Sequence, residues 1–465
     1  MQKKIFILFL SLFILLFNKA LSTEDQKITT VIEGVNFPVD LTKNKSISDQ
    51  SVFVLEHKTG KIIEIQNFHK NPIINPNPIL DIGALLSEVD NWEQGLNGFA
   101  FSPNFEKDKY IFVSYNNRNN EIIVSRFIYD DEKKKANLNS EKVLLRVSRL
   151  SNEEFHNCGT IVFHPIDGNL YTCIGDTASP ESSQNINNLN GKILRINPFN
   201  LNNDGKYYSI VEDNPFHKID GKAEIIFSGL RNPWKFSFDS ENGDIYVPDV
   251  GSEYIEELNI VKYKNFNNYL NFGWNCFEGD YRIYDKHYKD VSKGYDACIK
   301  NLNDKNINFV KPKLQYFHDS LFDESGLFGN SIIGGVLYKN KKSIWHDHYF
   351  FGDIVSSNIW YLDTTKKNNY IGLNFLSGED LGITSINQID NKLIATSYMG
   401  KIYQINLPMK KDYEKSIYRK PIINNKIYAI ELMNKNNEII FTTGSKMYKL
   451  LKSLREYKNR FLDFF

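Results

Sequence analysis

A histidine and an aspartate stand near the two ends of the stretch FHNCGTIVFHPIDGNLYTCIGD, residues 155–176. The segment PIDG at 165–168 combines a fixed φ, an Asx-type side chain and a glycine between two apolar runs, which is typical of a reverse turn. The stretch is therefore predicted to form a β-hairpin. His156 lies ten positions before Ile166 and Asp176 ten positions after it, so both are expected at the same open end.

A histidine beside a carboxylate is suited to proton transfer. An imidazole that titrates near neutral pH can take the proton of a hydroxyl group. A carboxylate on the other ring nitrogen would orient the ring and stabilise its charged form. The alternatives are that Asp176 caps the turn after its strand and that His156 is an ordinary polar residue at the surface.

Polar residues of two other predicted hairpins are expected at equivalent ends. The segment GLRNPWKFSFDSENGDIYVPDVG turns near Glu241, and EQGLNGFAFSPNFEKDKYIFVSYNN turns at residues 105–106. The residues placed at those ends are Glu93, Gln94, Arg231, Asn232 and Gly251. If the hairpins belong to one ring, these residues share one site with the histidine and aspartate.

Six similar pairs of strands recur along the chain. They are SVFVLEHKTGKIIEI from Ser51, YIFVSYNNRNNEIIVSRF from Tyr110, NLYTCIGD from Asn169 with GKILRINP from Gly191, DIYVPDVGSEYIEELNIV from Asp244, YFFGDIVSSNIWYL from Tyr349 and KLIATSYMGKIYQI from Lys392. Such repeats with almost no amphipathic helix predict an all-β fold, a six-bladed β-propeller of four-stranded sheets. A pair of β-sandwiches, the alternative, would not need a phrase to recur six times. In a propeller, equivalent hairpin ends face one mouth of the central channel.

The composition favours a folded protein without a nucleic-acid or membrane-surface partner. The 465 residues are 41% hydrophobic and 14% aromatic, enough for a large core. Lys+Arg and Asp+Glu number 56 each, so no net charge would attract nucleic acid or an anionic membrane.

The N-terminal segment has the organisation of a secretory signal. MQKK is followed by an apolar run from Ile5 to Phe17, and Ala20 and Ser22 have the small-residue spacing of a cleavage site. We expect a signal peptide at 1–22 and a secreted or periplasmic protein with no stable membrane insertion after cleavage. An uncleaved anchor is the alternative.

Four cysteines fit an exported protein with two disulfides. Cys158 and Cys173 are near each other across the first hairpin, and Cys276 and Cys298 flank an irregular loop, so we pair them in this way. The sequence alone permits three connectivities. A zinc site is disfavoured because no CxxC or Cys/His cluster has ligand spacing.

Eight short segments of the chain are each weak signals, but together they form a specific pattern. They are EQGLNGFAFSPNF, FHNCGTIVFHPIDGNLYTCIGD, LNGKILRINP, GLRNPWKFSFD, DVGSEYIEELN, NFGWNCFEGD, GNSIIGGVLY and YFFGDIVSSNIWYL. In kind and order, over roughly Val35–Ile405, they resemble the soluble quinoprotein glucose/sorbosone dehydrogenases, with the related aldose sugar dehydrogenases and hedgehog-interacting-protein-like propellers. The resemblance implies a six-bladed propeller with pyrroloquinoline quinone (PQQ) and Ca²⁺ in the channel mouth, an aldose substrate and an external electron acceptor.

The resemblance also implies roles for individual residues. It assigns catalysis to His156, Asp176 and Arg231. It assigns quinone contacts to Glu93, Gln94, Arg231 and Asn232, and calcium ligation to the backbone carbonyls of Gly251 and Ser252. His156 would take the proton of the sugar C1 hydroxyl as hydride passes to the quinone, Asp176 would orient it, and Arg231 would stabilise negative charge on the quinone.

Two departures from the family pattern concern the quinone. Family members that oxidise glucose hold the quinone carboxylates with a lysine and with arginines. In this chain the lysine position falls near Val355 and the arginine positions fall near Leu381 and Ile383, and no obvious basic residue replaces them. An unpaired carboxylate is costly to remove from water, so the chain is expected to bind PQQ weakly, to use a different electrophile or to hold no cofactor. Cys158 also replaces a glycine that usually follows the HN pair, and crowds the site.

The resemblance ends after Leu407. Residues 408–465 are Lys-rich and contain a hairpin pattern at 426–450 and a helical pattern at 452–462. We expect an appendage there, or alternatively a partner-binding element, behind a propeller at 23–407. Two functions remain open: an exported PQQ-dependent aldose dehydrogenase, and a non-catalytic propeller that binds a glycan or protein through the same mouth.

Overall fold

The computed structural model describes residues 28–88, 93–201, 205–219, 221–282, 298, 301, 303–305, 307–318, 329–365, 370–371 and 381–407. The predicted signal peptide and the predicted C-terminal appendage lie outside these residues. Within them, no helix is long and apolar enough to cross a membrane.

The described residues form six large sheets, numbered here in chain order, and one hairpin. The first contains β2 (Pro38–Thr42), β3 (Val52–Glu56), β4 (Lys61–Gln66), β5 (Ile73–Ile74) and β6 (Leu80–Asp81). The second contains β7 (Leu96–Phe101), β8 (Tyr110–Asn116), β9 (Glu121–Asp130) and β10 (Lys135–Ser148). The third contains β11 (Cys158–Phe163), β12 (Leu170–Ile174), β13 (Lys192–Asn197), β14 (Ser209–Ile210), β15 (Ile225–Ser228), β19 (Leu270–Asn271) and β22 (Asn308–Phe309).

The fourth sheet contains β16 (Ser237–Phe238), β17 (Ile245–Asp249), β18 (Ile255–Val261) and β23 (Leu314–Phe317). The fifth contains β24 (Ile332–Tyr338), β25 (His348–Asp353), β26 (Ile359–Asp363) and β27 (Tyr370–Ile371). The sixth contains β28 (Ile383–Ile389), β29 (Lys392–Ser397), β30 (Lys401–Ile405) and β1 (Ile28–Glu33), and the hairpin is β20 (Phe277–Glu278) with β21 (Tyr281–Arg282).

Helical structure is scarce among the described residues. It comprises α2 (Phe105–Asp108) and the 3₁₀ turns η1 (Gly83–Leu85), η2 (Pro180–Gln184), η3 (Pro215–Lys218) and η4 (Tyr263–Asn265). The chain is therefore mostly β, as predicted. All six repeated phrases form neighbouring antiparallel strands, which confirms the prediction of their pairing.

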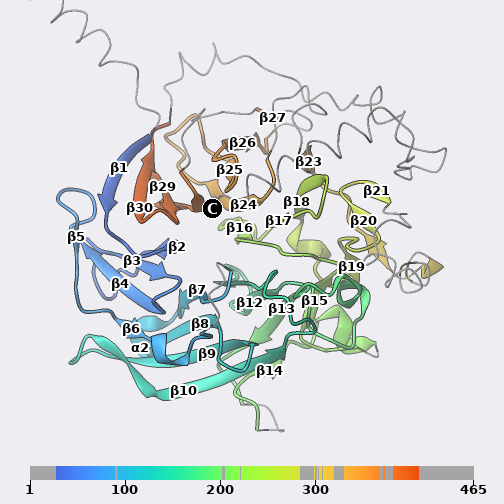
Figure 1. Cartoon of the computed structure of the whole chain (residues 1–465), viewed down its shortest axis with the longest axis horizontal. Helices are drawn as coiled ribbons and strands as arrows, with labels where there is room; N and C mark the ends of the chain where they lie inside the picture. Colours follow the sequence, from blue (N-terminus) through green and yellow to red (C-terminus); the bar gives the residue numbers. More distant parts are fainter. Residues whose placement is uncertain are drawn as a thin grey trace, which may run out of the picture.

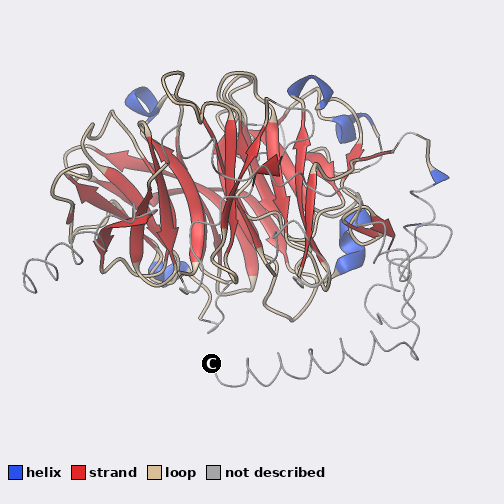
Figure 2. Ribbon diagram, turned by 90° about the horizontal axis from the view of Figure 1, so that it is seen from above, coloured by secondary structure: helices blue, strands red, loops and turns tan. Residues whose placement is uncertain are grey.

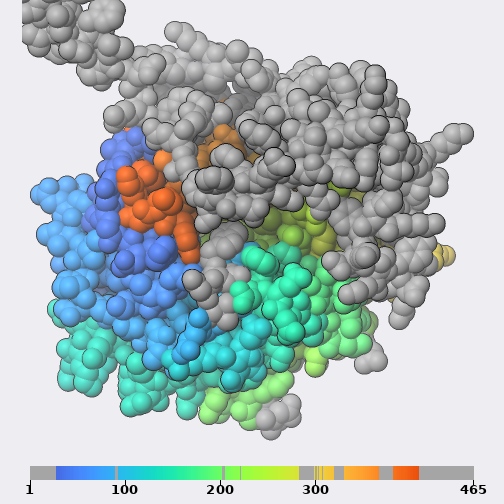
Figure 3. All heavy atoms as spheres, viewed as in Figure 1, coloured from blue at the N-terminus to red at the C-terminus, as the bar shows by residue number. Residues whose placement is uncertain are grey.

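The sheets pack against one another around a common centre (Figure 1). Each of six buried hydrophobic clusters combines residues of two neighbouring sheets, and one of these clusters joins the sixth sheet to the first. Strand β1 also pairs with β30, from Ile28 opposite Ile405 to Glu33 opposite Lys401. Accordingly, the blue and orange ends of the described chain lie side by side in Figure 3.

The prediction of four strands in every sheet is wrong for the first and third sheets. The third gains β19 and β22, which pair parallel to β15 and to each other. Both are two-residue strands, too short for a repeating pattern of hydrophobic residues to reveal them.

The first strand of each sheet lies on the inside of the arrangement. These inner strands are β2, β7, β11, β16, β24 and β28, and contacts join β2 with β7, β7 with β11, β16 with β24, β24 with β28, and β28 with β2. Figure 2 shows the sheets from the edge, with loops gathered above and below a layer of strands. We call the end at which the inner strands begin the His156 rim, and the end at which they finish the far rim.

Candidate active site at the His156 rim

The predicted pairing of His156 with Asp176 is present. Strands β11 and β12 pair with Cys158 opposite Ile174, so the residues two positions beyond the pair also meet. His156 Nδ1 lies 2.6 Å from Asp176 Oδ1, and the backbone N–H of His156 donates to Glu93 Oε2 at 2.6 Å. The Asp176 side chain is fully buried, whereas that of His156 is 16% exposed. The imidazole therefore reaches solvent while its partner does not.

Asp176 is held in its charged form by several donors. Its Oδ2 accepts a 2.7 Å hydrogen bond from Trp274 Nε1, and its Oδ1 accepts the backbone N–H of Ala178 at 2.9 Å. Burial would raise the pKa of Asp176, but His156, Arg231 and the indole N–H together hold that pKa below its ordinary value. Asp176 Oδ1 thus both caps a turn and contacts the imidazole of His156.

Arg231 adjoins this pair. Its backbone carbonyl accepts the N–H of Asp176 at 2.8 Å, and its guanidinium carbon lies 5.6 Å from the centre of the Trp274 ring. Its Nη1 donates to the carbonyl of Val250 at 3.1 Å. The other guanidinium nitrogens make no hydrogen bond to a described residue, so they are available to a negatively charged group of a ligand.

Asn232 and Glu93 lie at the same rim, but their side chains accept hydrogen bonds from backbone N–H groups. Asn232 Oδ1 accepts the N–H of Cys158 at 3.0 Å, which fixes the start of β11 to the start of β16. Glu93 supports His156 as described above. The Gln94 side chain is buried and donates to Asn120 at 3.0 Å, while its Oε1 has no hydrogen-bond partner among the described residues. Glu93 and Gln94 are the two residues of this segment predicted to contact the quinone. Of these, Gln94 keeps a side-chain oxygen without a hydrogen-bond partner among the described residues.

The predicted calcium ligands lie in a turn surrounded by carboxylates. Glu278 Oε1 accepts the backbone N–H groups of Ser252, Glu253, Tyr254 and Ile255 at 2.8–3.0 Å. The carbonyl oxygens of Gly251 and Ser252 accept no hydrogen bond from any residue that the structure describes. Two unpaired carbonyls in an acidic turn are suitable ligands for a hard cation.

Two buried carboxyl groups behind the turn resist ionisation. Burial raises the pKa of Asp249 to about 7, even though it accepts the backbone N–H groups of Arg231 and Asn232. Burial, with the neighbouring charges of Asp249 and Glu278, raises the pKa of Glu257 well above its usual range. A cation in the turn would favour the charged forms of both groups.

The three positions that carry basic residues in the family do not supply charge here. Val355 is 61% exposed, while Leu381 and Ile383 are buried in the hydrophobic cluster between the fifth and sixth sheets. Leu381 and Ile383 therefore contribute to the core rather than to a ligand site. The predicted disulfides, Cys158–Cys173 and Cys276–Cys298, are both present.

Trp274 and Arg149 are site residues that sequence reasoning missed. Trp274 lies in the phrase NFGWNCFEGD, where packing between sheets is the expected role and a platform for a sugar ring the alternative, and its bond to Asp176 joins residues 98 positions apart. Arg149 donates to Asn157 and to the carbonyl of Phe155, so it braces the segment that carries His156. The Trp274 contact leaves no local sequence signal, because it depends on how distant parts of the chain pack. The Arg149 contacts span only six and eight positions, but they lie in a connecting segment without a repeating pattern.

Replacing Trp274 with phenylalanine should raise the pKa of Asp176, because a donor that stabilises the carboxylate is lost while an aromatic ring remains. A carbon-13 NMR titration of the Asp176 carboxyl measures this shift. Trp234→Phe is the matched control, since Trp234 Nε1 donates to the carbonyl of Thr384 instead. An unchanged titration in the Trp274 variant, or the same shift in the control, would contradict the assignment.

Comparisons with known proteins identify the family of this chain. Residues 38–391 match the model of the family described as Glucose / Sorbosone dehydrogenase. The chain is 32% identical to the HIPL1 protein of Arabidopsis thaliana over 229 residues, which are 46% of this chain and 30% of that protein. It is 27% identical to quinoprotein glucose dehydrogenase B of Acinetobacter calcoaceticus over 299 residues, 57% of this chain and 55% of that protein. It is 26% identical to human Hedgehog-interacting protein over 238 residues, 47% of this chain and 33% of that protein.

These curated relatives are matched over little more than half of their own length at most. Among solved structures, the PQQ-bound aldose sugar dehydrogenase of Streptomyces coelicolor has a TM-score of 0.57 at 19% identity, covering 81% of this chain and 97% of that one. The apo-form of the soluble aldose sugar dehydrogenase of Escherichia coli has a TM-score of 0.60 at 18% identity, covering 82% and 99%. At such identities the likeness concerns the fold. Because the family model covers most of the chain, this protein belongs to the glucose/sorbosone dehydrogenase family.

Proposed function

We propose that this chain is a six-bladed β-propeller that oxidises the C1 hydroxyl of an aldose at the His156 rim, with hydride transfer to a quinone. The observation that carries the proposal is the 2.6 Å contact between His156 and the buried Asp176, beside the uncommitted donors of Arg231. The six sheets and the clusters between all neighbouring pairs support the propeller assignment.

The residues at the rim have distinct tasks in this reaction. With a hydrogen on Nδ1 donated to Asp176, His156 keeps Nε2 free to take the proton of a sugar hydroxyl. Asp176 then stabilises the imidazolium that results. The free guanidinium donors of Arg231 stabilise negative charge that develops on an adjacent ligand. When bound, a quinone would supply the two-electron acceptor that these side chains lack.

The rim fits one half of PQQ better than the other. The unpaired carbonyls of Gly251 and Ser252 and the donors of Arg231 fit a metal-bound quinone edge. The exposed Val355 and the buried Leu381 and Ile383 offer no cation to the carboxylates of PQQ. We therefore propose weaker PQQ binding than in basic members of the family, or a quinone with fewer carboxylates.

Calcium should raise the thermal stability of the purified chain even without quinone. A ligand bound only to the folded state adds RT ln(1 + [L]/Kd), about 2.7 kcal/mol at a hundredfold excess over Kd. Melting curves with millimolar calcium, with magnesium and with chelator measure the effect. Identical melting curves with calcium and with chelator would show that the folded chain does not bind calcium.

We propose a secreted or periplasmic location for the mature protein. Disulfides persist in oxidising compartments, and both predicted disulfides are present. The signal peptide proposed at 1–22 is consistent with that location.

A binding protein without catalysis is the second candidate. It is favoured by the missing cations and by similarity to a relative whose name describes interaction with another protein. Dye reduction discriminates between the candidates: the chain is loaded with PQQ and calcium and supplied with a panel of aldoses and an artificial electron acceptor. The oxidoreductase proposal predicts sugar-dependent reduction that His156→Ala abolishes. No reduction with any sugar, and no quinone absorbance after desalting, favours the binding protein.

A further inference from the structure

A second hollow opens at the far rim, away from the candidate active site. Its volume is about 550 Å³, within the range of small-molecule sites. Every inner strand contributes to its lining, for example through Leu41, Phe101, Val162, Ser237, Gly335 and Asn387. The segments that follow β2 and β7 also line it, whereas none of the candidate residues of the His156 rim does. The hollow is therefore the far end of the space between the inner strands.

A buried ion pair lies at the inner end of this pocket. Lys235 Nζ is 2.8 Å from Asp40 Oδ2 and donates to the carbonyl of Asn97 at 3.3 Å. The ammonium also lies 4.9 Å from the ring of Trp234. The Lys235 side chain is 6% exposed and that of Asp40 is 19% exposed. The carboxylate therefore faces the pocket more openly than the lysine does.

The pocket has polar groups that suit hydroxyls. Asp40 is fixed by the backbone N–H of Leu41 at 2.9 Å and by Asn387 Nδ2 at 3.3 Å. Asn387 Nδ2 also donates to Ser385, while its Oδ1 makes no hydrogen bond with a described residue. A hydroxyl group both donates and accepts hydrogen bonds. It could donate to the carboxylate of Asp40 or to the free amide oxygen of Asn387, and it could accept from the amide nitrogen of Asn387.

The charges around the pocket balance once the partners of its lining residues are counted. The lining lysines are Lys43, Lys45, Lys107 and Lys235, and the lining carboxylates are Asp40 and Glu106. Asp40 pairs with Lys235, while Asp390 and Asp49, just outside the lining, pair with Lys43 at 3.0 Å and 3.4 Å. Four lysines therefore stand against four carboxylates, which gives no excess of one sign to attract an anion or a cation. A neutral ligand suits it better than a phosphate or a carboxylate.

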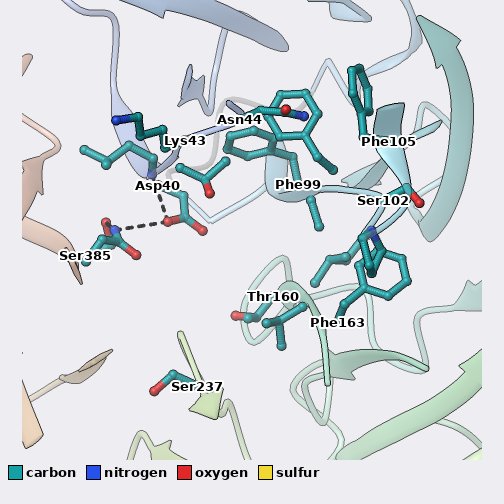
Figure 4. A pocket seen from close by; sticks show the side chains of 18 of the residues that line it. Asp40, Lys43, Asn44, Phe99, Ser102, Phe105, Thr160, Phe163, Ser237 and Ser385 are labelled. Atoms are coloured by element: carbon teal, nitrogen blue, oxygen red, sulfur yellow. Dashed lines mark hydrogen bonds between the residues drawn. The ribbon is translucent and has the colours of Figure 1, made fainter. Parts of the chain in front are cut away.

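Aromatic surface faces the polar groups. Phe101 and Phe163 are half-buried and line the pocket. In Figure 4, Asp40 and Ser385 lie on one side of the open space, and Thr160 and Phe163 lie on the other. A ring opposite polar side chains can cover the C–H face of a sugar while its hydroxyls bond to the other wall.

The space extends sideways beyond one sugar ring. A second hollow of about 290 Å³ shares Leu41, Thr42, Lys43, Lys45 and Asn387 with the first. We propose that the far-rim pocket binds a neutral saccharide of about two rings, separately from any sugar at the His156 rim. This proposal does not depend on the oxidoreductase activity.

Maltose binding to the full chain without quinone tests the proposal by isothermal titration calorimetry. Asn387→Leu should weaken maltose binding at least tenfold, because it removes the amide beside Asp40. Asn200→Leu, which removes the amide of an exposed residue that lines neither hollow, is the matched control and should bind maltose as the unaltered chain does. No binding, equal binding by the Asn387 variant, or an equal loss of binding in the Asn200 variant would overturn the proposal.

Hydrogen exchange locates the bound sugar even where the Asn387 variant folds poorly. Maltose should protect the amides of residues 41–46 and 385–387 from exchange in the unaltered chain, whether or not a sugar at the His156 rim also protects those of 155–158. Protection confined to 155–158 would show that maltose occupies only the His156 rim. Stronger binding of maltobionate, the acidic counterpart of maltose, would show that the pocket selects anions and would also overturn the proposal.

Discussion

Replacing Asp176 with asparagine should lower the turnover of the quinone-loaded chain by roughly 10⁴-fold, the scale seen when a histidine base loses its orienting carboxylate. Asparagine has nearly the shape of aspartate, and its oxygen can still accept either the bonds from His156 and Ala178 or the bond from Trp274. It carries no charge to stabilise the imidazolium, however, and its amide group can favour the wrong tautomer. Steady-state dye reduction with saturating aldose measures the loss.

The same variant makes a prediction about stability and pH. Folding lowers the pKa of Asp176, so its carboxylate stabilises the folded chain above the pKa of the unfolded state. This stabilisation is lost as the pH falls through the lower, folded-state pKa. The difference in free energy of unfolding between the unaltered chain and Asp176→Asn should therefore be full at neutral pH and shrink in acid. A small loss of turnover, or a stability difference that grows in acid, would contradict this role.

Replacing Lys235 with methionine should destabilise the fold by about 3 kcal/mol, since removal of one partner leaves the other charge of a buried pair uncompensated. The lysine joins the fourth sheet to Asp40 on β2 and to the carbonyl of Asn97 on β7. Methionine can fill much of the volume of the lysine side chain, so the loss of stability comes from the missing charge rather than from a cavity. Urea denaturation gives the free energy of unfolding.

A double variant separates the ion pair from other effects of the substitution. Asp40→Asn combined with Lys235→Met leaves neither charge without its partner, so it should recover a large part of the lost stability. Lys43→Met is the matched control, because Lys43 forms its ion pairs near the surface and should cost less than about 1 kcal/mol. If the double variant is less stable than Lys235→Met by the full cost of Asp40→Asn, the two charges are not coupled.

Much of the arrangement follows from patterns that lie close together in the sequence. In a hairpin, residues at equal distances before and after the turn lie at the same end. This rule alone predicts that His156 meets Asp176 and that Arg231 lies near Gly251. The recurrence of similar strand pairs predicts the repeated sheets, because each sheet must bury its faces against neighbours of the same kind. Both disulfides follow from the proximity of their cysteines.

The contacts that the sequence does not reveal join different sheets. Trp274 reaches Asp176 from a loop beyond β19, and Lys235 reaches Asp40 from 195 positions further along the chain. No periodicity or spacing encodes such contacts, because they depend on the packing of one sheet against the next. Gln94 illustrates the same limit: its position at the rim was predicted, but the direction of its buried side chain toward Asn120 was not.

The most direct test of the central claim follows the hydrogen on C1 of the sugar. The quinone-loaded chain is mixed with glucose, with glucose deuterated at C1 or with glucose deuterated at C2, and a single reduction of the quinone is recorded by its absorbance. Transfer of the C1 hydrogen as hydride, with His156 as the base, predicts slower reduction with the C1-deuterated sugar alone and no reduction in His156→Ala. Equal rates with all three sugars, or undiminished reduction in the variant, would contradict the proposed oxidation at the His156 rim.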